Sequence, residues 1–398
     1  MSDRRSWTLR TIESIAEVDP AAWDACACPP GRPRNPFLTH AFLHALEASG
    51  SAVAARGWQP VHLLLEDERG TLAGAVPLYL KAHSRGEYIF DHAWADAFQR
   101  AGGRYYPKLL SAVPFTPATG PRLLAAGPEA GRAEIEAQLL QGCIEVAQRL
   151  HVSSLHLNFL PEAQWRRAET QGLLLRTDQQ FHWHNEGYGR FDDFLASLSS
   201  KKRKNLKRER REALADGIEI EWVTGADLTE AHWDAFYRFY MDTSSRKWGD
   251  PYLTRDFFSR VGASMADEVL LIMCRRAGRW IGGAINFIGS DRLFGRNWGC
   301  IEDHRFLHFE ACYYQAIDFA IARGLACVEA GAQGTHKVAR GYLPARTHSA
   351  HWIAHPGLRD AVAEYLERER DWVAQDMEAI QAHSPFRIDA AAREQESE

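Results

Sequence analysis

Residues 61–80, VHLLLEDERGTLAGAVPLYL, align without a gap with residues 269–288, VLLIMCRRAGRWIGGAINFI. In each segment an apolar run is followed by a turn at a glycine and then by a second apolar run, which predicts a β-hairpin. The turn glycines Gly70 and Gly278 match, and so does a second pair, Gly74 with Gly282. The two hairpins therefore predict that the chain contains two copies of one unit.

A second pair of segments follows the hairpins in the same order. CIEVAQRLHVSSLHL at 143–157 parallels AIDFAIARGLACVEA at 316–330, and each predicts an amphipathic helix that runs into a strand. The repeated order predicts an α/β fold with mixed sheets in two tandem domains. Unrelated α/β halves can share such an order, but the gapless match between the hairpins favours a duplication.

The predicted domains divide a chain of 398 residues, a length that suits two cores. We expect a first domain, a linking helix, a second domain and a polar tail, at 1–190, 191–217, 218–388 and 389–398. The first domain is expected to carry an insertion at about 82–130.

The stretch KKRKNLKRERR, residues 201–211, is expected to be the core of the basic linking helix. It contains eight basic residues and one acidic residue, in a chain whose net charge is −5. A solvated charged face is the common interpretation of such a run. Because one acid cannot pair with eight bases, we favour binding of a polyanion. The candidate donor- or RNA-binding residues are Lys201, Lys202, Arg203, Lys204, Lys207 and Arg208.

The overall composition is that of a soluble globular protein, with 45% hydrophobic and 25% charged residues. No apolar run is long enough to span a membrane. The N-terminal MSDRRSWTLR lacks the apolar region of a secretory signal. The seven cysteines are dispersed without a CxxC pair, which is typical of reduced thiols. We therefore expect a cytoplasmic protein.

Four longer strings resemble one known family. They are NPFLTHAFLHALEASG (35–50), PLYLKAHSRGEYIFDHAWADAF (77–98), GGRYYPKLLSAVPFTPATGPRLL (102–124) and GAQGTHKVARGYLPARTHSAHW (331–352). The order of elements resembles the GNAT acyltransferase fold. The strings themselves resemble the FemAB-like N-acyltransferases, the peptidoglycan biosynthesis or recognition proteins. The resemblance covers most of residues 35–375 and departs from the family at Thr335, where the family usually has an acid.

The resemblance implies two GNAT-like domains linked by the basic helix. It also implies an enzyme that moves an acyl or aminoacyl group onto an amine, such as that of a peptide or cell-wall precursor. No cofactor is expected beyond the acyl donor, which is left open between aminoacyl-tRNA and acyl-coenzyme A. Two alternatives remain: a coenzyme-A-dependent GNAT acetyltransferase, and a non-catalytic module that recognises cell-wall peptide or RNA.

The donor question depends on the turn that would hold coenzyme A. GNAT enzymes bind the pyrophosphate on a glycine-rich turn that enters a helix. The equivalent stretch here, GCIEDHRFLHFEACYY at 299–314, has no glycine after Gly299 and carries Glu302 and Asp303. This departure favours another donor, and the Fem family uses aminoacyl-tRNA.

The loop GAQGTHKVARGY, residues 331–342, directly follows the predicted strand LACVEA and is the candidate catalytic site. His336 can accept a proton from an attacking amine, and a partly buried Glu329 is a second candidate base. Direct amide formation needs no nucleophilic side chain from the protein, because the acceptor amine itself attacks. A glycine-rich turn with solvated basic residues is the structural alternative. The candidate substrate-binding residues are Gly331, Gln333, Gly334, Lys337 and Arg340, and Gly341 would help to shape the backbone.

A second candidate binding region, GEYIFDHAWADAFQRAGGRYYPKL at 86–109, mixes aromatic rings with polar groups. Sugar and peptide sites use such mixtures, but the same residues would equally pack the insertion. The candidates are Asp91, Trp94, Tyr105, Tyr106 and Lys108. The stretch HWHNE at 182–186 has ligand-type residues, but no second HxxxH or CxxC accompanies it, so we predict no metal site.

Overall fold

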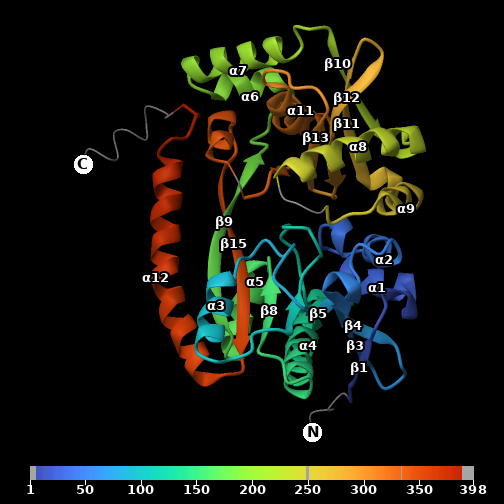
Figure 1. Ribbon diagram of the computed structural model, residues 1–398, viewed down its shortest axis with the longest axis vertical. Coiled ribbons are helices and arrows are strands. Elements are labelled where there is room, and N and C mark those ends of the chain that lie inside the picture. Colours follow the sequence, from blue (N-terminus) through green and yellow to red (C-terminus); the bar gives the residue numbers. More distant parts are fainter. Residues whose placement is uncertain (1–5, 248–250, 333, 388–398) are drawn as a thin grey trace. The chain divides into compact units, whose positions relative to one another are not determined.

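The computed structural model describes residues 6–247, 251–332 and 334–387 (Figure 1). The chain divides into two compact units. Unit 1 comprises Met1–Asp178, Tyr252–Ala266 and Arg346–Val373, and unit 2 comprises Gln179–Pro251, Asp267–Ala345 and Ala374–Glu398. The chain passes between the units inside strands β9 (Leu174–His184) and β15 (Leu343–Ile353), and again after Pro251, Ala266 and Val373. Unit 1 thus includes two later segments that the domain boundaries predicted from the sequence assign to the second domain.

Unit 1 contains strands on both sides of Pro77. Strands β1 (Thr8–Ile12), β3 (His62–Glu66), β4 (Leu72–Val76) and β7 (Leu124–Ala125) form an antiparallel sheet in that order, and β4 ends just before Pro77. Strand β5 (Leu78–Lys81), which begins just after Pro77, pairs antiparallel with β2 (Trp58–Pro60) and β6 (Lys108–Ser111). Strand β8 (Ser154–Asn158) is parallel to β6 and antiparallel to β15. A proline has no N–H for the ladder, which accounts for the break at Pro77.

The helices of unit 1 are α1 (Pro20–Ala27), α2 (His40–Ala48), α3 (His92–Arg100), α4 (Glu129–Arg149), α5 (Glu162–Thr170), α9 (Arg255–Met265) and most of α12 (Pro356–Gln381). Helix α4 packs on the β3–β4 hairpin. A Cβ at Gly74 would lie 2.8 Å from Ile135 and 2.9 Å from Leu139, so only glycine permits this approach. Apolar residues of α4 and the strands form the core of the unit.

The sheet of unit 2 has the order β10-β11-β12-β13-β14-β9. The strands are β10 (Ile218–Thr224), β11 (Val269–Arg276), β12 (Arg279–Ile288), β13 (Arg292–Cys300), β14 (Cys327–Glu329) and the unit 2 part of β9. The β13–β14 pair is parallel, and the other pairs are antiparallel.

The pairing directions of unit 2 repeat those of unit 1. In unit 1, the antiparallel pairs β3–β4 and β5–β6 are followed by the parallel pair β6–β8, which is reached through a helix, and by the antiparallel pair β8–β15. In unit 2, the antiparallel pairs β11–β12 and β12–β13 are followed in the same way by the parallel pair β13–β14 and the antiparallel pair β14–β9. Both hairpin turns contain a glycine at φ 76°, Gly70 and Gly278. Each hairpin also has a bulge that leaves one residue out of the strand pairing. That residue directly precedes Gly74 in unit 1 and Gly282 in unit 2. The predicted hairpins and mixed sheets are therefore confirmed.

Two helices pack on opposite faces of the unit 2 sheet. Ile272 of β11 belongs to the same apolar cluster as Ile317 of α11 (Gln315–Ala322). On the other face, a Cβ at Gly299 would lie 2.2 Å from the backbone oxygen of Phe239 in α8 (Glu230–Lys247). Figure 1 shows α8 in front of these strands. Further helical segments of unit 2 include α6 (Phe191–Ser197), α7 (Ser200–Ala213), α10 (Leu307–Phe309), the π-helix Glu310–Tyr314 and the 3₁₀ helix Thr335–Arg340.

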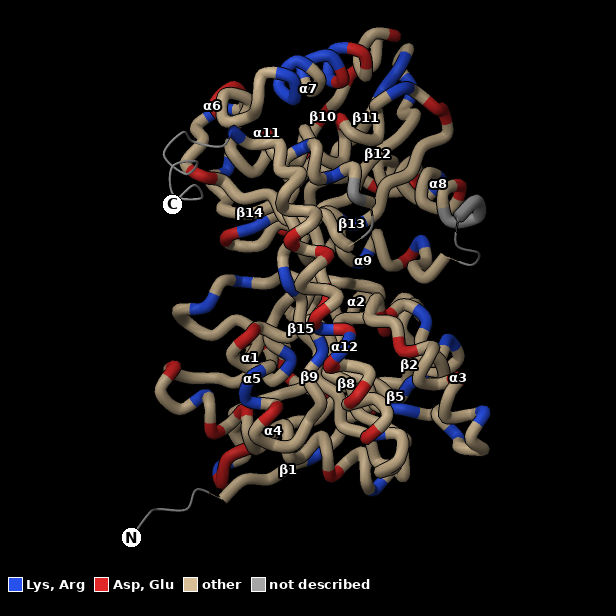
Figure 2. The backbone as a smooth tube through the Cα atoms, turned by 90° about the vertical axis from the view of Figure 1, so that its left-hand side faces the viewer, with Lys and Arg blue, Asp and Glu red and all other residues tan. Residues whose placement is uncertain are grey.

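The basic stretch forms helix α7 inside unit 2, and Figure 2 shows Lys and Arg gathered along it. Leu206 and Ala213 are its buried residues. That α7 links two domains stays a prediction.

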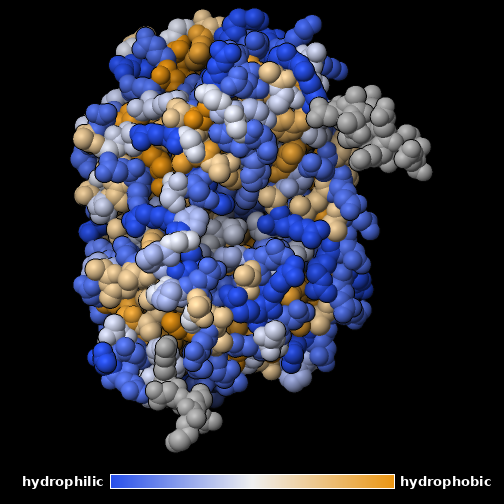
Figure 3. Space-filling model, turned by 180° about the vertical axis from the view of Figure 1, so that it is seen from behind, coloured by the Kyte–Doolittle hydropathy of each residue, from blue (hydrophilic) through white to orange (hydrophobic). Residues whose placement is uncertain are grey.

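The surface seen in Figure 3 is mostly hydrophilic, with hydrophobic residues in small groups between polar ones. None of the helices in the described part of the chain is both long enough and apolar enough to cross a membrane.

Candidate functional site

A pocket opens in unit 2 where two parallel strands diverge. Strands β13 and β14 pair only from Arg292–Cys327 to Phe294–Glu329. Strand β13 continues to Cys300, whereas β14 ends at Glu329. Beyond the last pair lies a cavity of about 480 Å³, lined by Gly295, Arg296, Asn297 and Trp298 on one side and by Ala330, Gly334, His336 and Lys337 on the other. The loop singled out in the sequence therefore borders a real cavity.

The other walls of the pocket come from residues that the sequence analysis did not select, including Tyr240, Asn286, His308 and Tyr313. A bulge shapes the β13 wall: Gly295 pairs with Asn286 and Asn297 with Ile285, so Arg296 is the extra residue. Bulges redirect side chains next to binding sites. The signal in the sequence was the polar pair Arg296–Asn297 inside the apolar strand RLFGRNWGC.

His336 has the chemistry of a proton acceptor in this pocket. Its Nε2 lies 3.0 Å from the Tyr313 hydroxyl. Burial lowers the pKa of His336 below its usual 6.5, and the positive charges of Arg340 and Lys337 lower it further. The imidazole is therefore neutral at neutral pH, as a base must be. Gly334 has φ 97°, and a Cβ there would lie 2.4 Å from the His336 ring.

The two basic residues of the loop are both buried and engaged. Lys337 donates from Nζ to the carbonyl oxygens of Ala330 (2.5 Å) and Gly331 (3.1 Å). Burial lowers the pKa of Lys337 to about 8. Arg340 pairs with Glu209 of α7 at 2.8 Å, and its guanidinium lies 3.5 Å from the Phe309 ring centre.

The glycines predicted to shape the loop have left-handed backbone conformations, with φ 76° at Gly331 and φ 89° at Gly341. Gln333 lies outside the described residues. Substrate binding by this loop stays a prediction.

Glu329, the other candidate base, is buried and faces Arg292, whose Nη1 lies 2.7 Å from its Oε1. Burial raises the pKa of this carboxyl, and Arg292 opposes the shift. Among the described residues, the pocket lining includes His336 but not Glu329. A direct role of Glu329 in proton transfer stays a prediction.

The candidates at 86–109 form a cluster of their own in unit 1. Lys108 is fully buried and donates to Glu87 at 2.7 Å and also to Asp91. Tyr105 donates its hydroxyl to Asp91 at 2.7 Å. Trp94 is buried beside this network, and the Tyr106 hydroxyl lies 2.8 Å from Ser84 Oγ. The polar side chains of this cluster are already engaged in hydrogen bonds, so a substrate could contact them only if some of these hydrogen bonds were broken.

Beside that network, the ammonium of Lys81 lies 3.5 Å from the Trp58 ring centre and 3.7 Å from Glu87. Burial lowers the pKa of Lys81 to about 7. This buried lysine was not predicted, because a Lys in a short apolar strand is normally expected to reach solvent.

Helix α7 presents the other group of candidates. Lys201, Lys204, Lys207 and Arg208 are exposed, and Lys202 and Arg203 are half-buried. Arg203 donates to the carbonyl oxygen of Leu198. On the inner side, Arg210 binds Glu310 at 2.8 Å and Asp318 at 2.7 Å. The exposed face of α7 is therefore the part suited to an anionic partner.

Comparison with known proteins identifies a matching family and several solved structures of similar fold. The FemAB-like family model, described as peptidoglycan biosynthesis/recognition, matches residues 14–388. No curated protein matches the chain. Among solved structures, FemX has a TM-score of 0.54 at 10% identity, covering 87% of this chain and 98% of that one. The C-terminal domain of a putative lysylphosphatidylglycerol synthetase from Agrobacterium fabrum has a TM-score of 0.52 at 9% identity, with coverage of 89% and 97%.

A third structure, L-PGS from Bacillus licheniformis, has a TM-score of 0.50 at 7% identity, and 85% of this chain and 98% of that one are covered. At these identities the likeness is one of fold.

Proposed function

The chain belongs to the FemAB-like family, and we propose that it is an N-acyltransferase that moves an acyl or aminoacyl group onto an amine acceptor by direct attack. The observation that carries this proposal is the pocket where β13 and β14 diverge, lined by His336 and by polar groups of two strands. FemX and the lysylphosphatidylglycerol synthetase domain share the fold. The second name contains a lysyl group, which is compatible with an aminoacyl donor.

In the proposed reaction, the acceptor nitrogen attacks the carbonyl carbon of the donor. The C–N bond forms, and the bond from the carbonyl carbon to the leaving oxygen or sulfur breaks. His336 accepts the proton lost by the amine and returns it to the leaving group. Asn286, Arg296 and Asn297 line the same pocket and carry donor groups, which we propose to stabilise charge on the carbonyl oxygen.

The loop around His336 has a supporting role. Lys337 ties the loop to the end of β14 through the carbonyl oxygens of Ala330 and Gly331. Nη1 of Arg340 donates a hydrogen bond of 2.7 Å to the backbone carbonyl oxygen of His336, which fixes the base on the Tyr313 side of the pocket. Rigid positioning of the reacting groups is the main requirement of direct acyl transfer.

The donor is proposed to be a polyanion that docks on the exposed face of α7, which fits aminoacyl-tRNA. The alternative, acyl-coenzyme A, gains some support from the turn at 299–314. Glu302 there is paired with Arg276 (3.1 Å), Arg279 (3.3 Å) and His304 (3.0 Å), so its charge is compensated. Glu302 therefore repels phosphate less than the sequence alone indicates.

A transfer assay distinguishes the candidates. Purified protein is incubated with a panel of amine acceptors and either charged tRNA or acyl-coenzyme A, and the products are identified by mass spectrometry. We expect transfer that depends on charged tRNA. Transfer from acyl-coenzyme A alone would support the acetyltransferase alternative. Binding of RNA or cell-wall peptide without any transfer, unchanged in pocket variants, would support a recognition module.

The same assay separates the two candidate bases. His336→Ala should lower turnover roughly a hundredfold, within the range of general acid–base groups. If Glu329 also takes part in proton transfer, Glu329→Gln should cause a comparable loss. Native turnover in both variants would contradict the placement of the chemistry in this loop.

A further inference from the structure

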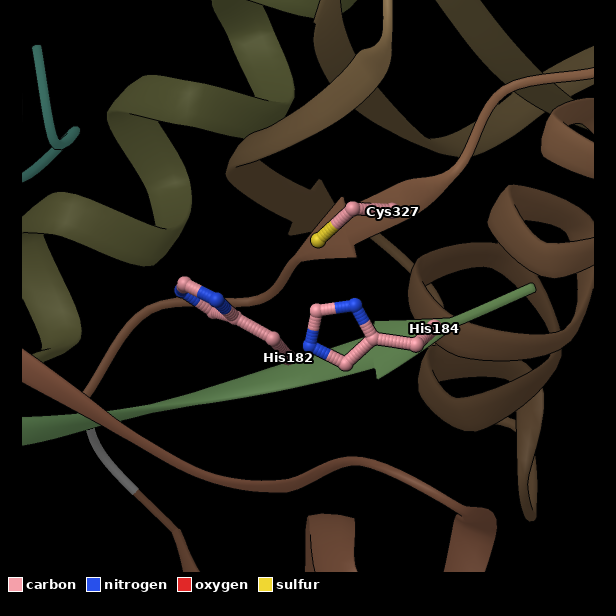
Figure 4. A group of neighbouring side chains, drawn as sticks. All are labelled: His182, His184 and Cys327. Carbon is pink, nitrogen blue, oxygen red and sulfur yellow. The ribbon is translucent and has the colours of Figure 1, made fainter. Parts of the chain in front are cut away.

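Away from the pocket, one face of the unit 2 sheet carries three side chains of metal-ligand type (Figure 4). Strands β9 and β14 pair antiparallel, with His184 opposite Cys327 and His182 opposite Glu329. Because side chains alternate along a strand, all four project from the same face. A nitrogen of each histidine and the Cys327 Sγ lie within 4.8 Å of one another. None of these three residues lines the pocket.

A second observation concerns the carboxylate next to His182. Nε2 of His182 lies 3.4 Å from Gln180 Oε1 and 4.0 Å from Glu329 Oε2. The Glu329 Oε2 atom is buried and has no hydrogen-bond partner in the described part of the chain. Metal-bound histidines usually give their other ring N–H to such an acceptor, which fixes the ring. The Glu329 Oε2 atom is therefore positioned to accept a hydrogen bond from the ring N–H of a His182 that binds a metal through its other ring nitrogen.

The burial of two of these side chains and the solvent access of the third suit a metal ion. His182 and Cys327 are buried, so little water competes for their ligand atoms. Zinc takes cysteine as the thiolate, so binding to Cys327 would release the thiol proton. His184 is exposed, which gives an ion a route to the other two. The nearby charges include Asp291, Glu329, Arg292 and Lys337, and Arg292 is paired with both carboxylates (2.9 and 2.7 Å).

We propose that His182, His184 and Cys327 bind a zinc ion, with the fourth position open to water. Two imidazoles and one thiolate suit a borderline ion such as Zn²⁺ better than Mg²⁺ or Ca²⁺. Ligand atoms around tetrahedral zinc lie on the order of 3.5 Å apart, so small side-chain rotations would close the site. The ion would join β9 to the three-residue strand β14, whose last residue precedes Ala330 of the pocket.

The test uses the full chain, stripped of metal with a chelator and then titrated with Co²⁺ and Zn²⁺. Cobalt reports the thiolate through its sulfur-to-metal charge-transfer band, and zinc affinity is measured by competition with a chromophoric chelator. We expect one ion per chain, the charge-transfer band, and a higher Tm with zinc, because binding to the folded state stabilises it.

Variants separate a true site from chance neighbours. Loss of a residue that hydrogen-bonds to a metal ligand typically lowers metal affinity 10–100-fold, and loss of a ligand itself should cost more. His184→Asn and Cys327→Ser should therefore each lower zinc affinity by at least about a hundredfold. His92→Asn and Cys28→Ser, which remove the same groups from unit 1, should bind as the native chain does. His184 is exposed, so its variant tests the site even if Cys327→Ser does not fold. Absence of the cobalt band, or native zinc affinity in His184→Asn, would overturn the proposal.

Discussion

The Nε2 atom of His336 lies 3.0 Å from the hydroxyl of Tyr313, and both side chains line the same pocket. Burial and two neighbouring cations keep the pKa of this histidine below 6.5. A base is active when it is deprotonated, so the rate should rise with pH as the imidazolium loses its proton.

We therefore expect kcat/KM to rise with an apparent pKa below 6.5 and to be level around neutral pH. His336→Ala should remove this acid limb together with roughly a hundredfold of the rate. The measurement is a pH–rate profile of the native chain, His336→Ala and the exposed control His383→Asn. An unchanged limb in His336→Ala would assign it to another group.

The ion pair between Arg340 and Glu209 provides a second test. If Arg340 binds a charged substrate, as the sequence predicts, Arg340→Ala should raise KM, and because Arg340 also holds the carbonyl oxygen of His336, kcat should fall as well. Glu209→Gln leaves the guanidinium in place and should not raise KM. Steady-state kinetics and thermal unfolding of both variants give the answer. Equal losses of Tm with native KM in both would make the pair purely structural.

The sequence predicted those features that depend on local pattern. The hairpins at Gly70 and Gly278 follow from alternating apolar runs around a turn, and the FemAB-like strings identified the family. The polar loop after β14 was visible because glycines and charges directly follow an apolar strand. These signals are contained within short segments, so no knowledge of spatial neighbours was needed.

The features that the sequence did not reveal depend on strand register. Asn286 and Tyr313 face the pocket only because β12, β13 and the helical segment after them come together there. Cys327 lies opposite His184 through a pairing between strands more than a hundred residues apart. The burial of Lys108 depends on Glu87 and Asp91, which are brought to it by the fold.

The exposed face of α7 should determine how salt affects donor binding. Replacing Lys201, Lys204, Lys207 and Arg208 by Gln should weaken binding of a polyanionic donor. Each lost phosphate contact should reduce the slope of log K against log salt by about 0.7 to 0.9. A matched control replaces four exposed arginines of unit 1 helices, Arg100, Arg149, Arg166 and Arg368. Equal effects of the two sets on the slope would mean that α7 has no special role.

Arg210, on the inner side of the same helix, should matter for stability. Its guanidinium bonds to Glu310, whose side chain is fully buried, and to Asp318. Arg210→Ala would leave a buried carboxylate without its partner, which typically costs about 3 kcal/mol or more. Chemical denaturation should show this loss, and the exposed neighbour Arg211→Ala should be close to native. A native midpoint for Arg210→Ala would show that Glu310 is satisfied by other groups.

The last prediction concerns the glycine beside the proposed base. Gly334 has φ 97°, and an added Cβ would lie 2.4 Å from the His336 ring. Gly324 also has a positive φ, 65°, but a Cβ there would meet nothing within 4 Å. Both Ala variants should therefore pay the cost of an L-residue at positive φ, about 1–2 kcal/mol. Only Gly334→Ala should also displace His336 and lower kcat. Equal turnover in the two variants would mean that the position of the His336 ring does not limit the reaction.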